Sequence, residues 1–250
     1  MKTKAMLWLL LICAPLMAYQ DNGFTLFTPT ALSQGDAEVN INHRFSGAVD
    51  NDVWNTLFGM NAGANVGFGF RRNFIYQLEG KASYTRAKKR VELGASWRPT
   101  PVMFPIAAQI DAAWFSFEEP GIEERRNNFF VLASVQNRIG SERATLTLNG
   151  GYDAYYERFI GGVGLCAKLT PSFALVGEYY PVLDRDSAPL ELQNHLGERD
   201  AFAFGIKLDT WGHQFLFSLS NSLQNHPATM SLGTDDSGDL HFGFNIQRRF

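Results

Sequence analysis

The amino-acid sequence predicts an all-β protein, a closed antiparallel transmembrane β-barrel of about twelve strands with both the N- and C-termini in the periplasm. Three observations lead to this prediction. The chain begins with a segment typical of signal peptides, apolar and polar residues then alternate with period two in about a dozen stretches, and short connections alternate with longer ones. Period two indicates β-strands, and the alternation of connections is typical of outer-membrane barrels.

The beginning of the chain has the order of residues found in secretory signal peptides. Lys2 and Lys4 precede an unbroken apolar stretch, and Ala18 comes shortly before a polar segment. The apolar stretch is shorter than the roughly 20 residues that a membrane-spanning helix needs, so cleavage after Ala18 is predicted. We therefore interpret residues 1–18 as a cleaved signal peptide and residues 19–250 as the barrel domain.

Composition and cysteine usage exclude several classes of protein. The formal net charge is −3 and no basic stripe concentrates the Lys and Arg residues, so nucleic acid is not an expected partner. A lipid anchor on Cys13 is the alternative to cleavage after Ala18, but Ile12 stands where a lipidation signal has a small residue. After cleavage only Cys166 remains, which leaves neither an intramolecular disulfide nor a cysteine-based zinc site.

Twelve stretches carry the strand pattern. In the first, Val39, Ile41 and Phe45 share one face, while Asn40 and Arg44 share the other. The length of several stretches matches the roughly 9 to 11 residues that a tilted strand needs to cross a bilayer. The predicted strands are residues 37–45, 62–70, 74–84, 90–98, 106–117, 128–139, 144–152, 159–169, 173–180, 201–208, 213–220 and 240–250.

The connections that follow odd-numbered strands differ in length from those that follow even-numbered strands. Short, turn-like connections follow even-numbered strands, for example Arg71–Asn73 and residues 170–172, whereas most odd-numbered strands are followed by longer polar segments. The longer segments are residues 46–60, 118–127, 181–200 and 221–239. Outer-membrane barrels have short periplasmic turns and long outer loops, and an even strand number places both termini in the periplasm.

Charged residues recur at mid-strand on one face of the predicted strands. In a barrel this face lines a hydrated lumen, while the apolar face contacts lipid. The predicted lumen-lining residues are Glu38, Arg44, Glu79, Lys81, Glu92, Arg98, Asp111, Arg138, Glu178 and Lys207. Acids and bases are equally numerous, so we expect them to pair with each other rather than form a charge ring that selects solutes. Neutralising Glu178 is then expected to lower thermal stability more than it changes permeability.

Aromatic residues gather near the predicted strand ends, where rings with a polar group favour the membrane interface. Phe74, Trp97, Trp211 and Phe250 fall at the predicted periplasmic ends. The rings assigned to the outer ends are Trp114, Phe117, Tyr152, Tyr155, Tyr156, Tyr179 and Tyr180. The alternative is that these rings form the core of a soluble β-protein.

The last part of the chain resembles a known family. The segment Trp211–Phe215, the triplet Ser220–Ser222 and the final residues Phe242–Phe250 are similar to the C-terminal signature of an uncharacterised family of bacterial membrane-bound β-barrel proteins. Residues 43–45, 58–61 and 178–179 also fit that pattern, although Trp211 stands where the family usually has a second Gly. The resemblance implies a barrel in the outer membrane and brings no catalytic residues.

The last strand also resembles the assembly signal of outer-membrane proteins. Phe242, Phe244, Ile246 and Phe250 carry this resemblance, which implies the barrel-assembly machinery as a partner. Outer-membrane lipid is the other expected partner.

Motifs for catalysis or metal binding are weak. His213 could activate Ser218, Ser220 or Ser222 as in a lipase, but no G-x-S-x-G nucleophile motif occurs. The acidic loop around Asp235, Asp236 and Asp239 lacks the bidentate Glu of an EF-hand and is interpreted as a solvated loop. We therefore expect no catalytic residues, no metal and no cofactor.

Two functions fit a barrel of this size. The first is a narrow pore for small solutes, because twelve strands enclose a wider lumen than the eight whose side chains fill the interior. The second is a non-conducting barrel that serves as a membrane anchor or binds an envelope protein through its outer loops. A membrane hydrolase is the third and weakest hypothesis. Conductance in planar bilayers separates the first two.

Overall fold

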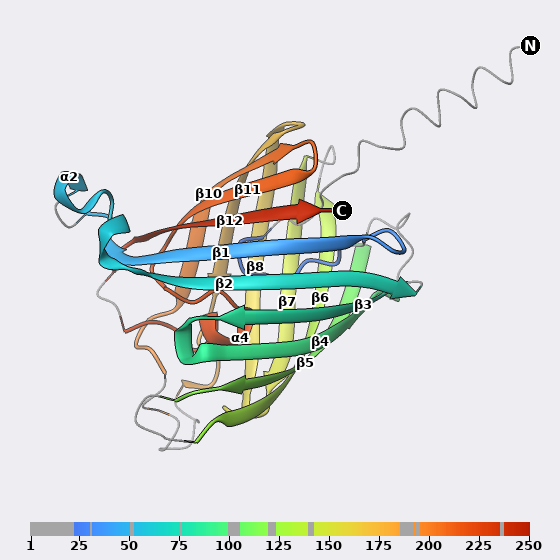
Figure 1. Cartoon of the computed structure of the whole chain (residues 1–250), viewed down its shortest axis with the longest axis horizontal. Helices are drawn as coiled ribbons and strands as arrows, with labels where there is room; N and C mark the ends of the chain where they lie inside the picture. Colours follow the sequence, from blue (N-terminus) through green and yellow to red (C-terminus); the bar gives the residue numbers. More distant parts are fainter. Residues whose placement is uncertain are drawn as a thin grey trace, which may run out of the picture.

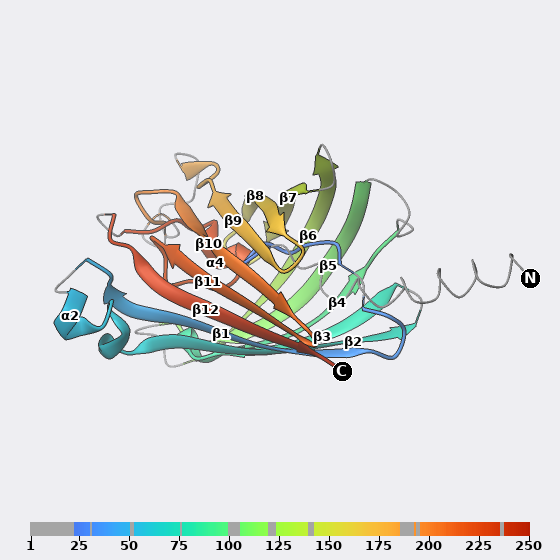
Figure 2. The same cartoon turned by 90° about the horizontal axis from the view of Figure 1, so that it is seen from above.

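The computed structural model shows a closed antiparallel barrel of twelve strands among the residues it describes (Figures 1 and 2). The described residues are 23–30, 32–50, 53–75, 77–99, 106–119, 124–139, 143–185, 193, 196–235 and 238–250. Each strand pairs with its sequence neighbours, and β1 pairs with β12 to close the ring. The predicted barrel class is confirmed. The signal peptide predicted at residues 1–18 lies outside the described residues.

The strands follow the alternation of the sequence closely. Their bounds are β1 Ala37–Ala48, β2 Ala64–Ile75, β3 Leu78–Thr85, β4 Arg90–Trp97, β5 Ile106–Phe117, β6 Arg126–Ile139, β7 Ala144–Asp153, β8 Arg158–Thr170, β9 Phe173–Tyr180, β10 Ala201–Thr210, β11 His213–Ser220 and β12 His241–Arg249. Because the ring is closed, the backbone N–H and C=O groups along each strand have partners on both sides, as a spanning sheet in lipid requires.

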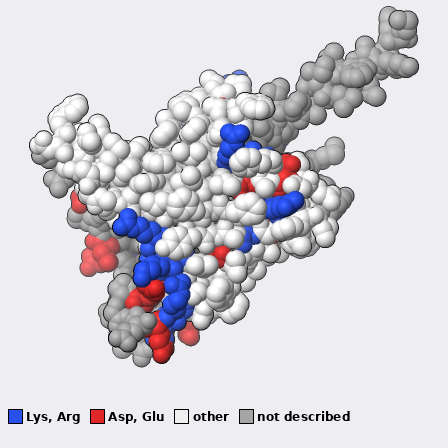
Figure 3. Space-filling view, in the orientation of Figure 1, with Lys and Arg blue, Asp and Glu red and all other residues white. Residues whose placement is uncertain are grey.

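The outer surface of the barrel is largely apolar. On β6, for example, Phe129, Val131 and Val135 are exposed, whereas the intervening Phe130 and Leu132 are buried inside. Figure 3 shows that most of the surface over β1 and β2 is neither acidic nor basic. Such an exterior suits contact with lipid tails. None of the helices in the described part of the chain is long and apolar enough to cross a membrane.

The two ends of the barrel differ. The end that carries the connections after odd-numbered strands is called the loop end, and the opposite one, where β1 begins and β12 finishes, the turn end. The loop end carries the short helices α2 (Val53–Thr56), η2 (Met60–Ala62), η3 (Ala87–Lys89) and α4 (Pro227–Met230). The predicted difference in length is observed for most connections. The exceptions are residues 86–89 and 154–157, which have only four residues at the loop end, and residues 98–105, which have eight at the turn end.

The predicted turn at Arg71–Asn73 is wrong, because β2 continues to Ile75. Arg71 points into the lumen, where its Nε donates to Glu38 Oε1 at 2.8 Å, and the buried Asn73 also faces inward, whereas Arg72 lies exposed on the outer face. The chain turns near Gln77 instead, which has a φ of 65°.

The orientation of the barrel in the membrane stays a prediction that cysteine labelling tests. Asn127 lies at the loop end and Ser172 at the turn end, and both are exposed. We expect a cysteine at position 127 to react with a membrane-impermeant thiol reagent on whole cells and one at position 172 to remain unlabelled. The native Cys166 is buried and gives little background. Labelling at 172 with protection at 127 would show the inverted orientation. Asp236, a second position predicted to face outward, lies outside the described residues.

The interior is not uniformly polar, which corrects the sequence-based assignment of faces. Phe115, Phe130, Leu132 and Ile160 point inward and form a buried apolar cluster. We call these four residues the inner apolar wall. Phe117, Tyr156 and Tyr180, which were predicted at the membrane interface, are also buried within the molecule. Inward positions can be apolar here because other segments of the chain enter the lumen and cover them.

Candidate functional site: the barrel lumen

A segment that precedes β1 lies inside the barrel. It comprises residues 23–30 and 32, and we call it the strap. Figure 2 shows this blue segment within the ring of strands. Its Phe24, Leu26 and Leu32 are buried. None of its described residues belongs to a strand, so side chains of the wall satisfy much of its backbone.

Glu178 on β9 binds the strap most extensively. Its carboxylate accepts hydrogen bonds from the backbone N–H groups of Phe24, Thr25 and Leu26, with the Thr25 nitrogen 3.0 Å from Oε2 and the Leu26 nitrogen 3.3 Å from Oε1. The hydroxyls of Thr25 and Tyr180 also donate to Oε2, each at 3.0 Å. Hydrogen bonds to an ionised acceptor are roughly twice as strong as neutral ones, so this carboxylate holds the strap at mid-lumen.

Two asparagines bind the strap from other parts of the wall. Asn149 on β7 accepts from the Phe27 nitrogen at 3.0 Å and donates to the Phe27 oxygen at 2.8 Å. Asn245 on β12 donates to the Phe24 oxygen at 2.7 Å. Because β7 and β12 lie on different sides of the barrel, the strap crosses the lumen between them.

A charged cluster holds the strap at the turn end. The backbone N–H of Leu32 donates to Glu79 Oε1 at 2.8 Å, and Asn73 Nδ2 donates to the Leu32 oxygen at 2.7 Å. Glu79 is buried and forms ion pairs with Arg98 and, at 3.7 Å, with Arg71. Two guanidinium groups therefore surround the carboxylate that binds the strap.

Apolar contacts complete the seat of the strap. Leu26 packs in a buried cluster with Tyr180 and Met230. A Cβ atom built on Gly162 or Gly164 would lie 2.8 Å or 2.2 Å from a Leu26 methyl group, so these two glycines of β8 make room for Leu26. Fully burying one such side chain contributes about 1.5–3 kcal/mol.

The long connection between β11 and β12 also enters the lumen. Its helix α4 begins after His226, whose Nδ1 accepts from the Ala228 nitrogen at 3.2 Å. The His226 ring meets Phe27, Phe115 and Phe130 edge-on, with centroids 5.1–5.2 Å apart. Burial and the neighbouring cations of Arg90 and Lys81 hold the pKa of His226 well below its ordinary value. A neutral imidazole therefore connects α4, the strap and the inner apolar wall.

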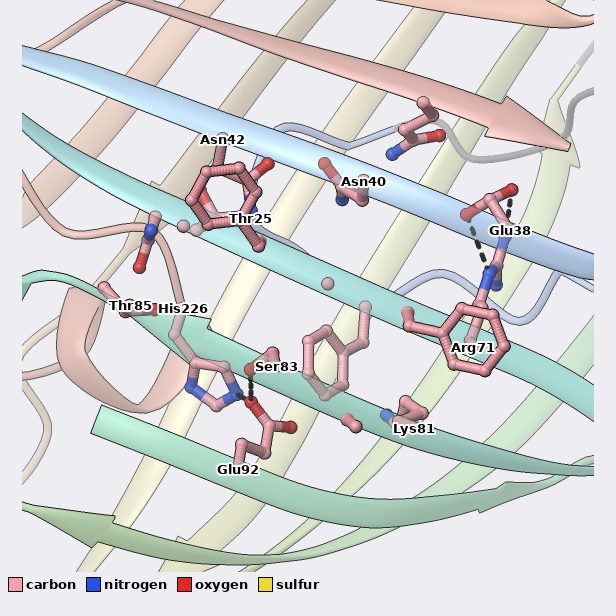
Figure 4. A pocket seen from close by; sticks show the side chains of 18 of the residues that line it. Thr25, Glu38, Asn40, Asn42, Arg71, Lys81, Ser83, Thr85, Glu92 and His226 are labelled. Atoms are coloured by element: carbon pink, nitrogen blue, oxygen red, sulfur yellow. Dashed lines mark hydrogen bonds and ion pairs between the residues drawn. The ribbon is translucent and has the colours of Figure 1, made fainter. Parts of the chain in front are cut away.

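A cavity of about 180 Å³, lined by both polar and apolar groups, remains between the strap and a wall formed mainly by β1–β4 (Figure 4). We call it the lumen cavity. Side chains that line it include Asn40, Asn42, Arg71, Lys81, Ser83 and Glu92.

The predicted lumen residues lie on the inward-facing positions of their strands, except that Arg98 follows the end of β4 by one residue and is buried there. All except Arg138, which is exposed at the turn end of β6, are buried or half-buried. The expected mutual pairing occurs for Glu79 with Arg98 and for Lys81 with Asp111.

Other predicted lumen residues have partners that the sequence did not indicate. Glu38 pairs with Arg71, and Lys207 Nζ lies 3.3 Å from Asp209 Oδ2. Arg44 Nη1 donates to Asn245 Oδ1 at 2.7 Å.

Glu178 forms no ion pair with a base among the described residues, although Arg44 interacts with it electrostatically; backbone amides of the strap bind its carboxylate instead. Sequence reasoning also missed Asn149, Asn245 and His226. Asn149 and Asn245 do lie at inward-facing positions of their strands, as the alternation predicts. A neutral amide in the sequence does not indicate, beyond this, that its side chain binds another segment of the chain.

His213 does not meet the serines considered for a hydrolase. Its ring stacks on Phe215 on the outer face, and its Nε2 lies 2.7 Å from Arg248 Nη1. Ser218 and Ser220 are buried on the opposite face of β11.

The residues of the predicted assembly signal lie along the last strand. Phe242, Phe244 and Ile246 have the outward parity of β12, and Phe250 is 66 % exposed just beyond its end. Their role in assembly stays a prediction.

Comparisons with known proteins agree with this architecture. Residues 153–250 match the family described as membrane bound beta barrel domain (DUF5777). This confirms the resemblance over that range, while residues 43–45 and 58–61 fall outside it. No curated protein matches the chain.

Solved structures with a similar fold are porins and outer-membrane proteins. The KdgM porin is 7 % identical with a TM-score of 0.51, and the match covers 86 % of this chain and 99 % of KdgM. KdgM in complex with disordered oligogalacturonate gives the same TM-score and coverage at 8 % identity. Omp33 of Acinetobacter baumannii is 8 % identical with a TM-score of 0.45, covering 87 % of this chain and 99 % of Omp33.

The similarity to KdgM concerns the fold. Together with the family match, the closed ring and the apolar exterior, it defines the chain as an outer-membrane β-barrel protein.

Proposed function

We propose that this protein is a narrow outer-membrane pore for small solutes and that displacement of the strap opens it. The observation that carries the proposal is that a segment outside the sheet, rather than wall side chains alone, fills the lumen. The strap is joined to the wall by hydrogen bonds and apolar contacts, each of which breaks without disrupting the pairing of the strands.

The inner wall supports this proposal because it leaves space for a removable segment. Gly162 and Gly164 face the strap, and Gly67 and Gly69 line the lumen cavity. A barrel stabilised only by its own side chains would fill these positions, as small barrels do. Neither the described residues nor the comparisons support the alternative of a non-conducting scaffold.

Planar bilayers test the proposal directly. We expect the full mature protein to show a small and weakly ion-selective conductance, and a variant that lacks residues 23–32 to conduct several-fold more current. The reason is that this deletion removes the strap and leaves the paired strands unchanged.

Each protein is first checked for heat-modifiable migration on a gel, because a closed barrel resists detergent until it is boiled. Folded barrels that carry no current with or without the strap would overturn the pore proposal.

A further inference from the structure

The geometry of the lumen cavity points to a binding site for a small, uncharged solute rich in hydroxyl groups, of the size of a monosaccharide. The inference rests on the proposed pore, because a solute reaches this cavity through the lumen. It adds a substrate class that the barrel fold does not specify.

Amide groups without a protein partner surround the cavity. The Oδ1 atoms of Asn40 and Asn42, Oε1 of Gln247 and Nδ2 of Asn225 are buried, and none has a hydrogen-bond partner among the described residues. Gln247 as a whole is only 5 % exposed. Buried polar atoms are normally hydrogen-bonded, so acceptors and a donor converge on a space where a ligand can satisfy them.

This set of atoms matches hydroxyl groups. Each hydroxyl both donates and accepts, so one ligand can bond to the amide oxygens and to the amide nitrogen. Ser83 and Thr85 extend the same chemistry along β3, and both lie beside the cavity in Figure 4.

The charged groups beside the cavity are balanced by each other. Arg71 donates from Nε and Nη2 to the two oxygens of Glu38, at 2.8 and 3.0 Å, and Lys81 pairs with Asp111. Glu38 and Arg71 lie on the adjacent strands β1 and β2, whereas Lys81 on β3 reaches past β4 to Asp111 on β5. A charged solute would have to compete with a bond that already exists.

The remaining acid and base complete this balance. Glu92 accepts from Ser83 Oγ at 2.8 Å, and its Oε2 lies 3.8 Å from His226 Nε2. The guanidinium of Arg90 lies over the ring of Phe115, 5.2 Å from its centroid. Of the charged residues that line the cavity, Glu38, Arg71 and Lys81 are held in ion pairs and Glu92 accepts from Ser83, so an ionised solute would lose its hydration and compete with existing partners for its counter-charge.

Gly69 lines the cavity and provides a variant that fills it. At Gly69 the atom nearest to an added Cβ is the Cβ of Asn40, at 3.6 Å, which is an ordinary contact, so Gly69→Leu places its side chain in the cavity. Gly150 is the matched control, because it has outward parity on β7 and an added Cβ meets nothing within 4 Å. Neither glycine has a positive φ.

Saturation-transfer NMR titrations of the full mature protein in detergent test the site. The probes are glucose, glucuronate and glucosamine, which share one ring and differ in charge. We expect glucose to bind about tenfold more tightly than either ion, because both ions lose hydration. Gly150→Leu should keep this binding, Gly69→Leu should lose it, and Gly69→Ala should weaken it.

The possible results distinguish failure of the solute site from failure of the pore proposal. Equal binding of the three probes, no binding of glucose, or unchanged binding in a Gly69→Leu barrel with native heat-modifiable migration would each overturn the solute site. Conductance in the strap-deleted variant would still support the pore in those cases. Glucose binding without conductance would instead overturn the pore and keep the site.

Discussion

Replacing Glu178 with Gln should raise the open fraction of the pore by about ten- to a hundredfold, because hydrogen bonds to a charged group contribute about 1.5–3 kcal/mol and 1.4 kcal/mol is a factor of ten. The carboxylate accepts from three consecutive amides of the strap. A neutral Gln can accept fewer of these bonds and turns its own NH₂ group toward the same donors. Single-channel recordings measure the open fraction.

The thermal unfolding of the Glu178→Gln barrel should change little, since the paired strands remain intact. This reverses the expectation from the sequence, which assumed that the acid pairs with a base across the lumen. Glu118→Gln is the matched control, because Glu118 is an exposed carboxylate at the loop end that pairs with Lys89 and Arg125. An unchanged open fraction in Glu178→Gln, or an equal increase in both variants, would contradict the role given to Glu178.

Acidification should open the pore through His226. Burial holds the pKa of this imidazole well below that of a His released from the lumen, which titrates near the ordinary 6.5. The released state therefore binds more protons below about pH 6.5, and the docked α4 loop loses up to about 1.4 kcal/mol per pH unit. Above that pH both states are neutral and the docking free energy is constant. Conductance recorded from about pH 7.5 down to pH 5 measures the effect.

The charged groups around His226 determine that acidification weakens, rather than strengthens, the docking of the α4 loop. Arg90 and Lys81 oppose protonation, as burial does, whereas the carboxylate of Glu92 at 3.8 Å favours it and is the smaller influence. His226→Asn is the control, since Asn is a good N-cap for α4 and does not titrate. An identical acid response in His226→Asn would assign the effect to another group.

The strands could be predicted because a membrane barrel fixes the environment of each face. On β5, β9 and β11 the predicted bounds are those observed. The error at Arg71–Asn73 has a physical cause, since three consecutive polar residues signal a turn only where water surrounds them. Here Arg71 extends into the lumen, and a lumen permits a polar residue in mid-strand.

The strap could not be predicted, because its seat depends on distant residues. Residues 23–32 show no period-two alternation, and their partners Glu178, Asn149 and Asn245 follow more than a hundred positions later. The inward parity of Glu178 was readable from the sequence, but its partner was not. The buried, inward position of Tyr180 could not be predicted for the same reason. The residues that pack with its ring, Leu26 of the strap and Met230 of α4, are distant in the sequence.

Because the strap is part of the same chain as the barrel, it competes effectively with any separate peptide for its binding site in the lumen. Only residues 33–36 join it to β1, and Gly35 among them has a φ of 90° that favours glycine. A short tether keeps a released segment at an effective concentration of about millimolar near its seat. A separate peptide with the sequence of residues 23–32 would have to reach a similar concentration to occupy a strap-deleted barrel. The attached strap therefore returns to its seat at a rate independent of how many copies of the protein the membrane contains.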